Sequence, residues 1–192
     1  TTQTGIGDQY GWWNSLAPGD FDKDGDMDYI AGNLGLNSFY RASSKEPVRM
    51  YAKDFDNNGS YDAVPSVYLP GSLDDPVRRE YIANMRDDVI KQIVGFKAKY
   101  RNYKSYALAP FDQMFTKEEM TGVLKVQANT FAHAFIQNMG NGRFVMHPLP
   151  VQAQFSCING MLADDFNGDG NLDLMINGND HGAEVSGGRY DA

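Results

Sequence analysis

One nine-residue acidic stretch, at residues 20–28, constrains the fold of this chain more than any other part of it. It reads DFDKDGDMD, with oxygen-bearing side chains at its positions 1, 3, 5 and 9 and a glycine at position 6. Ca²⁺ takes about 6–8 oxygen ligands, so alternate side chains of a tightly curled loop can surround it together with the carbonyl of position 7. The spacing predicts a calcium loop with the ligands Asp20, Asp22, Asp24, Asp28 and the carbonyl of Asp26.

The same pattern occurs twice more, as DFDNNGSYD at residues 54–62 and as DFNGDGNLD at residues 165–173. The predicted ligands are Asp54, Asp56, Asn58, Asp62 and the carbonyl of Ser60 in the second loop, and Asp165, Asn167, Asp169, Asp173 and the carbonyl of Asn171 in the third. Asp, Asn and Gly are also ordinary turn formers, so an ion-free role is the alternative. Because ordinary turns do not require this register three times, we predict three Ca²⁺ sites.

These loops differ from EF-hands. An EF-hand needs a bidentate Glu at position 12, where this chain has Ala31, Pro65 and Ile176. The residues that follow each loop are short, apolar and bounded by turns, as is typical of strands rather than helices. The loops are therefore predicted at the tips of β-hairpins, where a cation would relieve the repulsion between carboxylates and couple metal binding to folding.

The three loops, together with NMGNGRF at residues 138–144, resemble the repeats of FG-GAP/VCBS proteins, which pair a DxDxDGxxD calcium loop with a later NxG[ND]GxF hairpin. The resemblance covers most of the chain and is closest to bacterial cell-surface or secreted members with a helical insertion. It implies a mainly β fold in which each repeat is one four-stranded blade of a β-propeller, as in the integrin α-subunit head. We expect a partial propeller of about two full blades and one partial blade. Asn58 and Asn167 depart from the family pattern and lower the charge of their sites.

Loop spacing predicts one structural domain in three segments. Residues 1–73 hold the first two loops, residues 74–125 form a helical insertion, and residues 126–192 hold a further hairpin and the third loop. In the insertion the apolar period changes from 2 to about 3.6, and Thr116 and Glu119 form a capping-box pattern, so we expect two or three short helices. The Asn141-Gly142 turn predicts a hairpin that completes the blade of the second loop.

The helical insertion is locally basic. Between residues 75 and 104, eight basic residues stand against four acidic ones. The excess indicates a docking surface for an anionic glycan or an acidic protein, and an ordinary solvated helix face is the alternative. The predicted ligand-binding residues are Arg78, Arg79, Lys97 and Lys99.

The overall charge argues against nucleic acid as a partner. The formal net charge is −8, and three bound Ca²⁺ would bring it to −2, so the acidity lies mainly in the predicted metal sites.

The single cysteine, Cys157, excludes an internal disulfide and is expected to be buried. No stretch is apolar enough to span a membrane, and no signal peptide opens the chain. Because free calcium is high outside cells, we expect a piece of an exported protein, secreted or on a bacterial surface.

The two tryptophans and two of the histidines are less specific indications of function. Trp12 and Trp13 suggest sugar stacking, but aromatic side chains dominate β cores, so we expect them to fill space between blades. His133 and His147 lie in no cluster of potential ligands and are expected to be half-buried strand residues.

The pattern favours a non-catalytic, calcium-stabilised adhesion or scaffolding module over an enzyme, because metal and turn chemistry account for every distinctive residue. The expected partners are a protein or anionic glycan, the rest of a parent propeller and, through exposed sheet faces, a second copy of the chain. One alternative is part of a calcium-dependent polysaccharide lyase or hydrolase, with acid and base drawn from Lys97, Tyr100, Tyr103 and Lys104. A structural spacer is the other.

Overall fold

The chain folds into two units, one inserted into the other. The computed structural model describes residues 3–71 and 74–179. The outer unit comprises Thr1–Phe39 and Thr130–Ala192, and the inserted unit comprises Tyr40–Asn129. This division differs from the predicted segments, because the second acidic loop belongs with the helices and not with the first loop.

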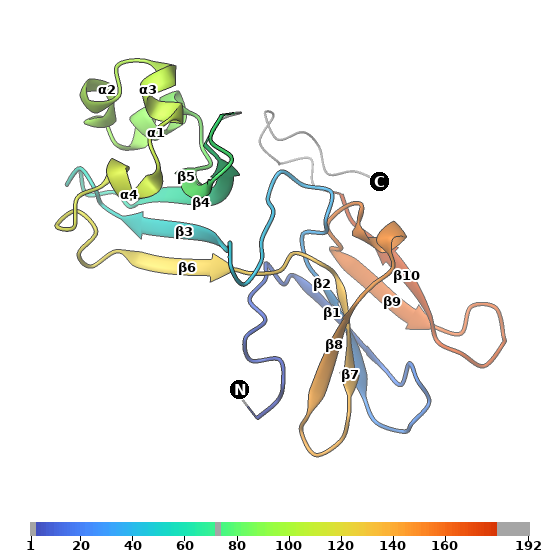
Figure 1. The fold of residues 1–192 in the computed structure, drawn as a ribbon. Helices are drawn as coiled ribbons and strands as arrows, with labels where there is room; N and C mark the ends of the chain where they lie inside the picture. Colours follow the sequence, from blue (N-terminus) through green and yellow to red (C-terminus); the bar gives the residue numbers. More distant parts are fainter. Residues whose placement is uncertain (1–2, 72–73, 180–192) are drawn as a thin grey trace. The chain divides into compact units, whose positions relative to one another are not determined.

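The outer unit is built on antiparallel β-sheet (Figure 1). Its four-stranded sheet has the order β1-β2-β7-β8, and a separate two-stranded sheet pairs β9 with β10. Its elements are β1 (Ser15–Gly19), β2 (Asp28–Gly32), β7 (Ala134–Asn138), β8 (Phe144–Pro148), the 3₁₀ helix η1 (Val151–Gln154), β9 (Gly160–Asp164) and β10 (Asp173–Asn177).

The predicted Asn-Gly hairpin is confirmed, but the blade to which we assigned it was wrong. Asn141 and Gly142 adopt φ of 53° and 74°, as a tight hairpin turn between β7 and β8 requires. β7 pairs with β2, with Ile30 opposite Phe135, so the hairpin completes the sheet of the first acidic loop and not that of the second. The sequence could not show this, because the inserted unit supplies its own third and fourth strands.

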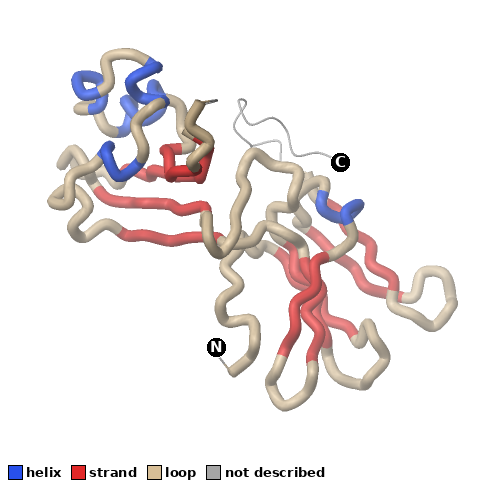
Figure 2. Tube along the Cα trace, viewed as in Figure 1, coloured by secondary structure: helices blue, strands red, loops and turns tan. Residues whose placement is uncertain are grey.

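The inserted unit places four short helices on one side of a second four-stranded sheet, which has the order β5-β4-β3-β6 (Figures 1 and 2). We predicted two or three helices, and the described part of the insertion has four. The elements are β3 (Val48–Lys53), β4 (Asp62–Pro70), β5 (Arg78–Ile82), α1 (Arg86–Gln92), α2 (Phe96–Lys99), α3 (Tyr103–Ala107), α4 (Phe111–Met114) and β6 (Leu124–Ala128).

An aromatic core joins these helices to their sheet. Tyr51 of β3 stacks on Phe111 of α4, with ring centroids 4.2 Å apart. Phe96 of α2 and Met114 of α4 are also buried in this core. Helices of four to seven residues are too short to be stable alone, so this apolar contact with the sheet stabilises them.

The predicted capping box forms, but no helix follows it. Thr116 N donates to Glu119 Oε2 at 2.7 Å, and Glu119 N donates to Thr116 Oγ1 at 3.2 Å. Residues 117–122 form turns, and the backbone reaches Gly122 at a φ of 75°. Only Gly adopts this conformation without strain, so the segment turns directly into β6.

A buried polar cluster, formed by Asn33, His133 and Gln154, joins three segments of the outer unit. Asn33 N donates to His133 Nδ1 at 2.8 Å, so the ring proton lies on Nε2, which donates to the Ser156 carbonyl at 2.8 Å. His133 N donates to Gln154 Oε1 at 2.9 Å. His133 is fully buried and precedes β7, whereas His147 is exposed on β8. The predicted half-burial was therefore wrong for both, and the predicted strand position is confirmed for His147 alone.

Within the described residues, the sheets do not close into a propeller. What the structure shows is a mainly β chain with two four-stranded antiparallel sheets and one two-stranded sheet.

Candidate metal centres

All three acidic stretches connect antiparallel strands in the same register. The last Asp of each stretch pairs with the residue before the first, as Gly19 with Asp28, Lys53 with Asp62, and Asp164 with Asp173. The predicted position at hairpin tips is confirmed. Each tip is therefore an eight-residue loop that begins with the position-1 Asp and ends before the position-9 Asp.

Two positions in each loop have a left-handed backbone. The predicted glycine at position 6 has φ between 82° and 91° in all three loops. Position 4 has positive φ as well, at Lys23 (63°), Asn57 (59°) and Gly168 (75°). We did not predict the second feature, although Asn57 and Gly168 are residues that favour this conformation.

The carboxylates at the two ends of each loop bind backbone N–H groups inside it. The position-1 Asp accepts from the position-6 glycine: Gly25 N to Asp20 Oδ2 is 3.1 Å, and the two equivalent distances are 2.9 and 2.8 Å. The position-9 Asp accepts from the position-2 Phe N–H at 2.9–3.2 Å. The side chains therefore shape the turn as well as offering oxygens to a cation.

Middle positions continue the same scheme. The side chain at position 3 accepts from the N–H of position 5, and that at position 5 accepts from the N–H of position 7. In the first two loops these bonds use one lone pair of each side-chain oxygen, and that oxygen retains a second. Turn formation and cation binding are thus compatible in one loop.

In the first two loops the carboxylates converge. Oxygens of Asp20, Asp22 and Asp28 lie within 4.8 Å of one another, as do those of Asp54, Asp56 and Asp62. Such clusters fit a hard cation, which binds carboxylate oxygens at about 2.3–2.6 Å. Asp24, the fourth predicted side-chain ligand of the first loop, is not part of the convergent group.

Two features of these clusters favour a cation. Asp20 Oδ1 is buried and has no hydrogen-bond partner, and a buried unpaired carboxylate oxygen is costly unless an ion contacts it. In the second loop, burial and repulsion from Asp56 and Asp54 raise the pKa of Asp62 above its ordinary value. A divalent cation between these oxygens would offset both costs.

The third loop satisfies its carboxylates differently. Asp169 accepts from the backbone N–H and the side-chain amide of Asn171, and from the side-chain amide of Asn167 at 3.2 Å. These bonds lower the pKa of Asp169. Within the described residues, its acids do not form a convergent cluster like those of the first two loops. Asn at positions 3 and 7 therefore supplies internal donors where a cation would otherwise neutralise charge.

The first loop is also fastened to the neighbouring hairpin. Asn138 N donates to Asp28 Oδ1 at 2.8 Å, Asn138 Nδ2 donates to the Met27 carbonyl at 3.1 Å, and Gln137 Nε2 donates to Asp22 Oδ2 at 2.7 Å. We assigned no role to either side chain. The available signal was Asn138, the first residue of the hairpin motif, which is the one that contacts the loop.

The four predicted anion-binding residues lie on two elements, Arg78 and Arg79 on β5 and Lys97 and Lys99 on α2. Arg78 Nε pairs with Glu46, Arg79 Nη1 pairs with Asp75, and Lys99 Nζ donates to the Met114 carbonyl. Internal partners therefore already engage three of the four.

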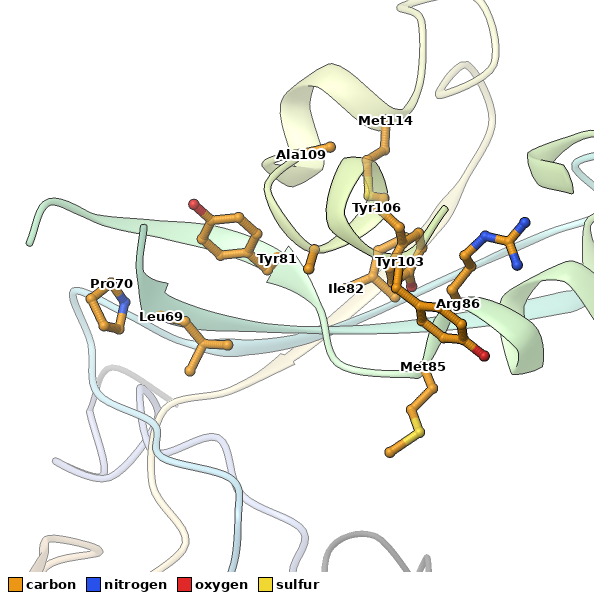
Figure 3. Close-up of a pocket in the computed structure, with 11 residues that line it drawn as sticks. Leu69, Pro70, Tyr81, Ile82, Met85, Arg86, Tyr103, Tyr106, Ala109 and Met114 are labelled. Carbon is orange, nitrogen blue, oxygen red and sulfur yellow. The ribbon is translucent and has the colours of Figure 1, made fainter. Parts of the chain in front are cut away.

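The inserted unit contains a mostly apolar cavity of about 360 Å³ that we did not predict (Figure 3). Its lining comes from β4, β5, α3 and the segments beside them. These segments share no sequence pattern from which the cavity could have been predicted. The residues are Leu69, Pro70, Tyr81, Ile82, Met85, Arg86, Tyr103, Tyr106, Ala107, Ala109 and Met114.

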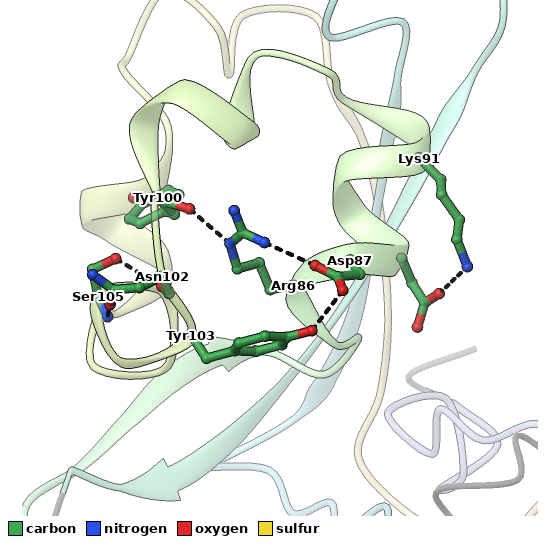
Figure 4. A network of polar contacts seen from close by, with 8 residues as sticks. Arg86, Asp87, Lys91, Tyr100, Asn102, Tyr103 and Ser105 are labelled. Atoms are coloured by element: carbon green, nitrogen blue, oxygen red, sulfur yellow. Dashed lines mark hydrogen bonds and ion pairs between the residues drawn. The ribbon is translucent and has the colours of Figure 1, made fainter.

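A network of polar contacts at the edge of this cavity fixes α1 against α3 (Figure 4). Arg86 Nε donates to the Tyr100 carbonyl at 2.7 Å, and Arg86 Nη1 binds Asp87 Oδ1 at 2.8 Å. The Tyr103 hydroxyl donates to Asp87 Oδ2 at 2.5 Å, which raises the pKa of Tyr103 and lowers that of Asp87. Burial raises the pKa of Tyr100.

Comparisons of the chain with models of protein families, with curated proteins and with solved structures found no match. Among the described residues, no helix has the length and apolar character needed to cross a membrane.

Proposed function

We propose that this chain is a calcium-binding β module of an exported or cell-surface protein, with a non-catalytic adhesion or scaffolding role. The observation that carries the proposal is the convergence of three carboxylates within 4.8 Å at the tip of each of two hairpins. Asp20, Asp22 and Asp28 would hold one ion, and Asp54, Asp56 and Asp62 another. Bound Ca²⁺ would neutralise the carboxylates and hold the loop ends together.

The third loop, residues 165–173, is proposed as a weaker calcium site. Asp165 and Asp173 occupy the same loop positions as in the other two sites, but the amides of Asn167 and Asn171 already bind Asp169. These amide donors compete with a cation for the Asp169 carboxylate, and a smaller effective ligand charge lowers the affinity of a calcium loop. The sheets would serve as FG-GAP/VCBS blades, and partners would include a protein or anionic glycan and further blades of a longer chain.

The geometry gives little support to a lyase or hydrolase. A catalytic base near neutral pH must have a pKa near the working pH. Tyr103 donates to Asp87, and Tyr100 is buried, so both phenols have raised pKa values. The two tyrosines among the four candidate residues are therefore poorly suited to act as the base, which favours the non-catalytic function.

Calorimetric titration of calcium into the metal-free protein tests the proposal. We expect two tighter binding events and one weaker event. Asp20→Ala and Asp54→Ala should each remove one tight event, whereas Asp165→Ala should remove only the weak one. Magnesium is the control ion, because its stricter octahedral geometry and reluctance to lose water disfavour a multi-carboxylate loop. No heat of calcium binding, or the same stoichiometry in Asp20→Ala and Asp54→Ala, would refute the proposal.

A further inference from the structure

The outer unit has a second cavity, away from the acidic loops, whose lining is aromatic and carboxamide. It has a volume of about 430 Å³, within the range of about 300–1,000 Å³ typical of small-molecule sites. Its lining consists of Trp12, Asn14, Leu34, Cys157, Asn159 and Asn179. No charged side chain lies among these lining residues.

Trp12 is held in a fixed position with part of its indole ring open to solvent. Its backbone N–H donates to Asn33 Oδ1 at 3.0 Å, and its ring packs edge-on against Phe131 with centroids 4.9 Å apart. Even so, 41% of the residue is exposed. An exposed, rigid aromatic ring is a flat apolar platform, and our expectation that Trp12 fills space between blades does not explain it.

The carboxamides are fixed through their backbones. Asn14 N donates to the Gly32 carbonyl at 3.0 Å, and Asn159 N donates to the Asn177 carbonyl at 2.9 Å, so both residues are tied to strands. Asn14 Nδ2 approaches Asn159 Oδ1 at 3.4 Å, and Asn159 Nδ2 donates to the Asn179 carbonyl at 3.3 Å. Each carboxamide offers both donors and an acceptor, and neighbouring sugar hydroxyls require both.

We propose that this cavity binds a neutral saccharide. The Trp12 ring would pack against the C–H face of a sugar, and the carboxamides of Asn14 and Asn159 would bind its hydroxyls. Leu34 and Cys157, both buried, would form the apolar part of the wall. An anionic ligand is disfavoured because the described lining residues include no cation to pair with it. The site is independent of the calcium loops, so failure of either proposal leaves the other standing.

Intrinsic fluorescence gives a direct test, because the chain has only two tryptophans. In Trp13→Phe, emission excited at the red edge of the absorption band reports on Trp12 alone. The calcium-loaded protein is titrated to about 200 mM with the methyl glycosides of glucose, galactose, mannose and N-acetylglucosamine, and with methyl glucuronide. Saturation-transfer NMR on the same samples detects binding that leaves the emission unchanged.

At least one neutral glycoside should give a saturable response, about tenfold weaker in Asn159→Ala, which corresponds to the loss of about one hydrogen bond. Asn37→Ala, an exposed asparagine outside the cavity, is the matched control and should bind as the parent does. A second variant, Asn14→Ala, should behave like Asn159→Ala. Three results would overturn the proposal: no response by either method, equal binding by Asn159→Ala and the parent, or tighter binding of methyl glucuronide.

Discussion

The outer unit and the inserted unit present the same acidic hairpin loop on two different supports. In the outer unit, Asp28 of the first loop binds Asn138 of the next hairpin, and a buried polar cluster around His133 lies in the same unit. In the inserted unit, the second loop extends from a sheet covered by short helices with an aromatic core. The loop geometry is therefore set locally, and quite different packing can support it.

The two units also differ in charge. The inserted unit has 14 of the 17 Lys and Arg residues and 12 acids, a formal charge of +2, which leaves −10 on the outer unit. The net positive charge would draw an anionic partner to the inserted unit, whereas calcium would bind the local carboxylate clusters of both units. The following predictions test this contrast, from the largest expected effect to the smallest.

Loss of core volume should affect the inserted unit alone. Met114 is 1% exposed in the aromatic core, so Met114→Ala should destabilise this unit by about 2–5 kcal/mol through the cavity it leaves. Urea unfolding followed by tyrosine and tryptophan signals measures the loss. Met139→Ala, at an exposed methionine, is the control. A matching loss of calcium binding at the first loop would show that the units do not respond separately.

Removing the position-9 carboxylate should cost more in the first loop than in the second. Asp28 accepts from the backbone N–H groups of Phe21 and Asn138, whereas a single bond, from Phe55 N, is resolved for Asp62. In the presence of a chelator, Asp28→Ala should lower the free energy of unfolding by about 2–4 kcal/mol and Asp62→Ala by about half as much. The reason is that each buried unsatisfied donor costs about 1–3 kcal/mol. Urea midpoints in EDTA provide the comparison. Equal losses would mean that the hairpin does not fasten the first loop.

Acid should weaken the outer unit through His133. Burial lowers the pKa of this ring below the ordinary value of 6.5, so the folded state holds it neutral. The unfolded chain takes up a proton as pH falls through about 6.5, and stability present above that pH is lost below it, by up to about 1.4 kcal/mol per pH unit.

Thermal melts between pH 7.5 and 5 measure this dependence. His133→Gln should flatten it in that range, while His147→Gln, at an exposed histidine, should leave it unchanged. If the stability of His133→Gln depended equally steeply on pH, groups other than His133 would be responsible for the dependence.

The smallest effect concerns the basic residues of the inserted unit. Arg78→Ser breaks an exposed ion pair with Glu46 and should cost at most about 1 kcal/mol, whereas Lys97→Ser, for which the structure resolves no ion pair, should cost almost nothing. Chemical unfolding of both variants at low and high salt checks this. If Lys97→Ser lowered the free energy of unfolding by more than this, Lys97 would have a structural role that its contacts do not reveal.

Local features of the fold were predictable from sequence, and non-local ones were not. The hairpin tips and the Asn141-Gly142 turn follow from side-chain spacing and from residues that tolerate positive φ. The strand with which the β7–β8 hairpin pairs cannot be predicted in this way, because the edge of a sheet can pair with any strand of suitable backbone conformation. An insertion of 90 residues, Tyr40–Asn129, separates that hairpin from β2.

The candidate sites divide in the same way. The convergence of carboxylates in the first two loops was predictable because each group lies within nine residues. The Asn138 contact to Asp28 and the Trp12 cavity each join segments more than 100 residues apart. The ion pair of Arg78 with Glu46, 32 residues earlier, is likewise non-local, whereas the pair of Arg79 with Asp75, four residues earlier, is local.

The central claim is that the acidic loops are metal sites and not only turns. Its most direct test is a thermal melt in excess EDTA, followed by titration with calcium to millimolar concentrations and a parallel titration with magnesium. We expect a large rise in Tm with calcium and a much smaller one with magnesium, because binding to the folded state alone stabilises it. The double variant Asp20→Ala/Asp54→Ala should lose most of the rise. An unchanged Tm in calcium, or the same rise in the double variant, would contradict the claim.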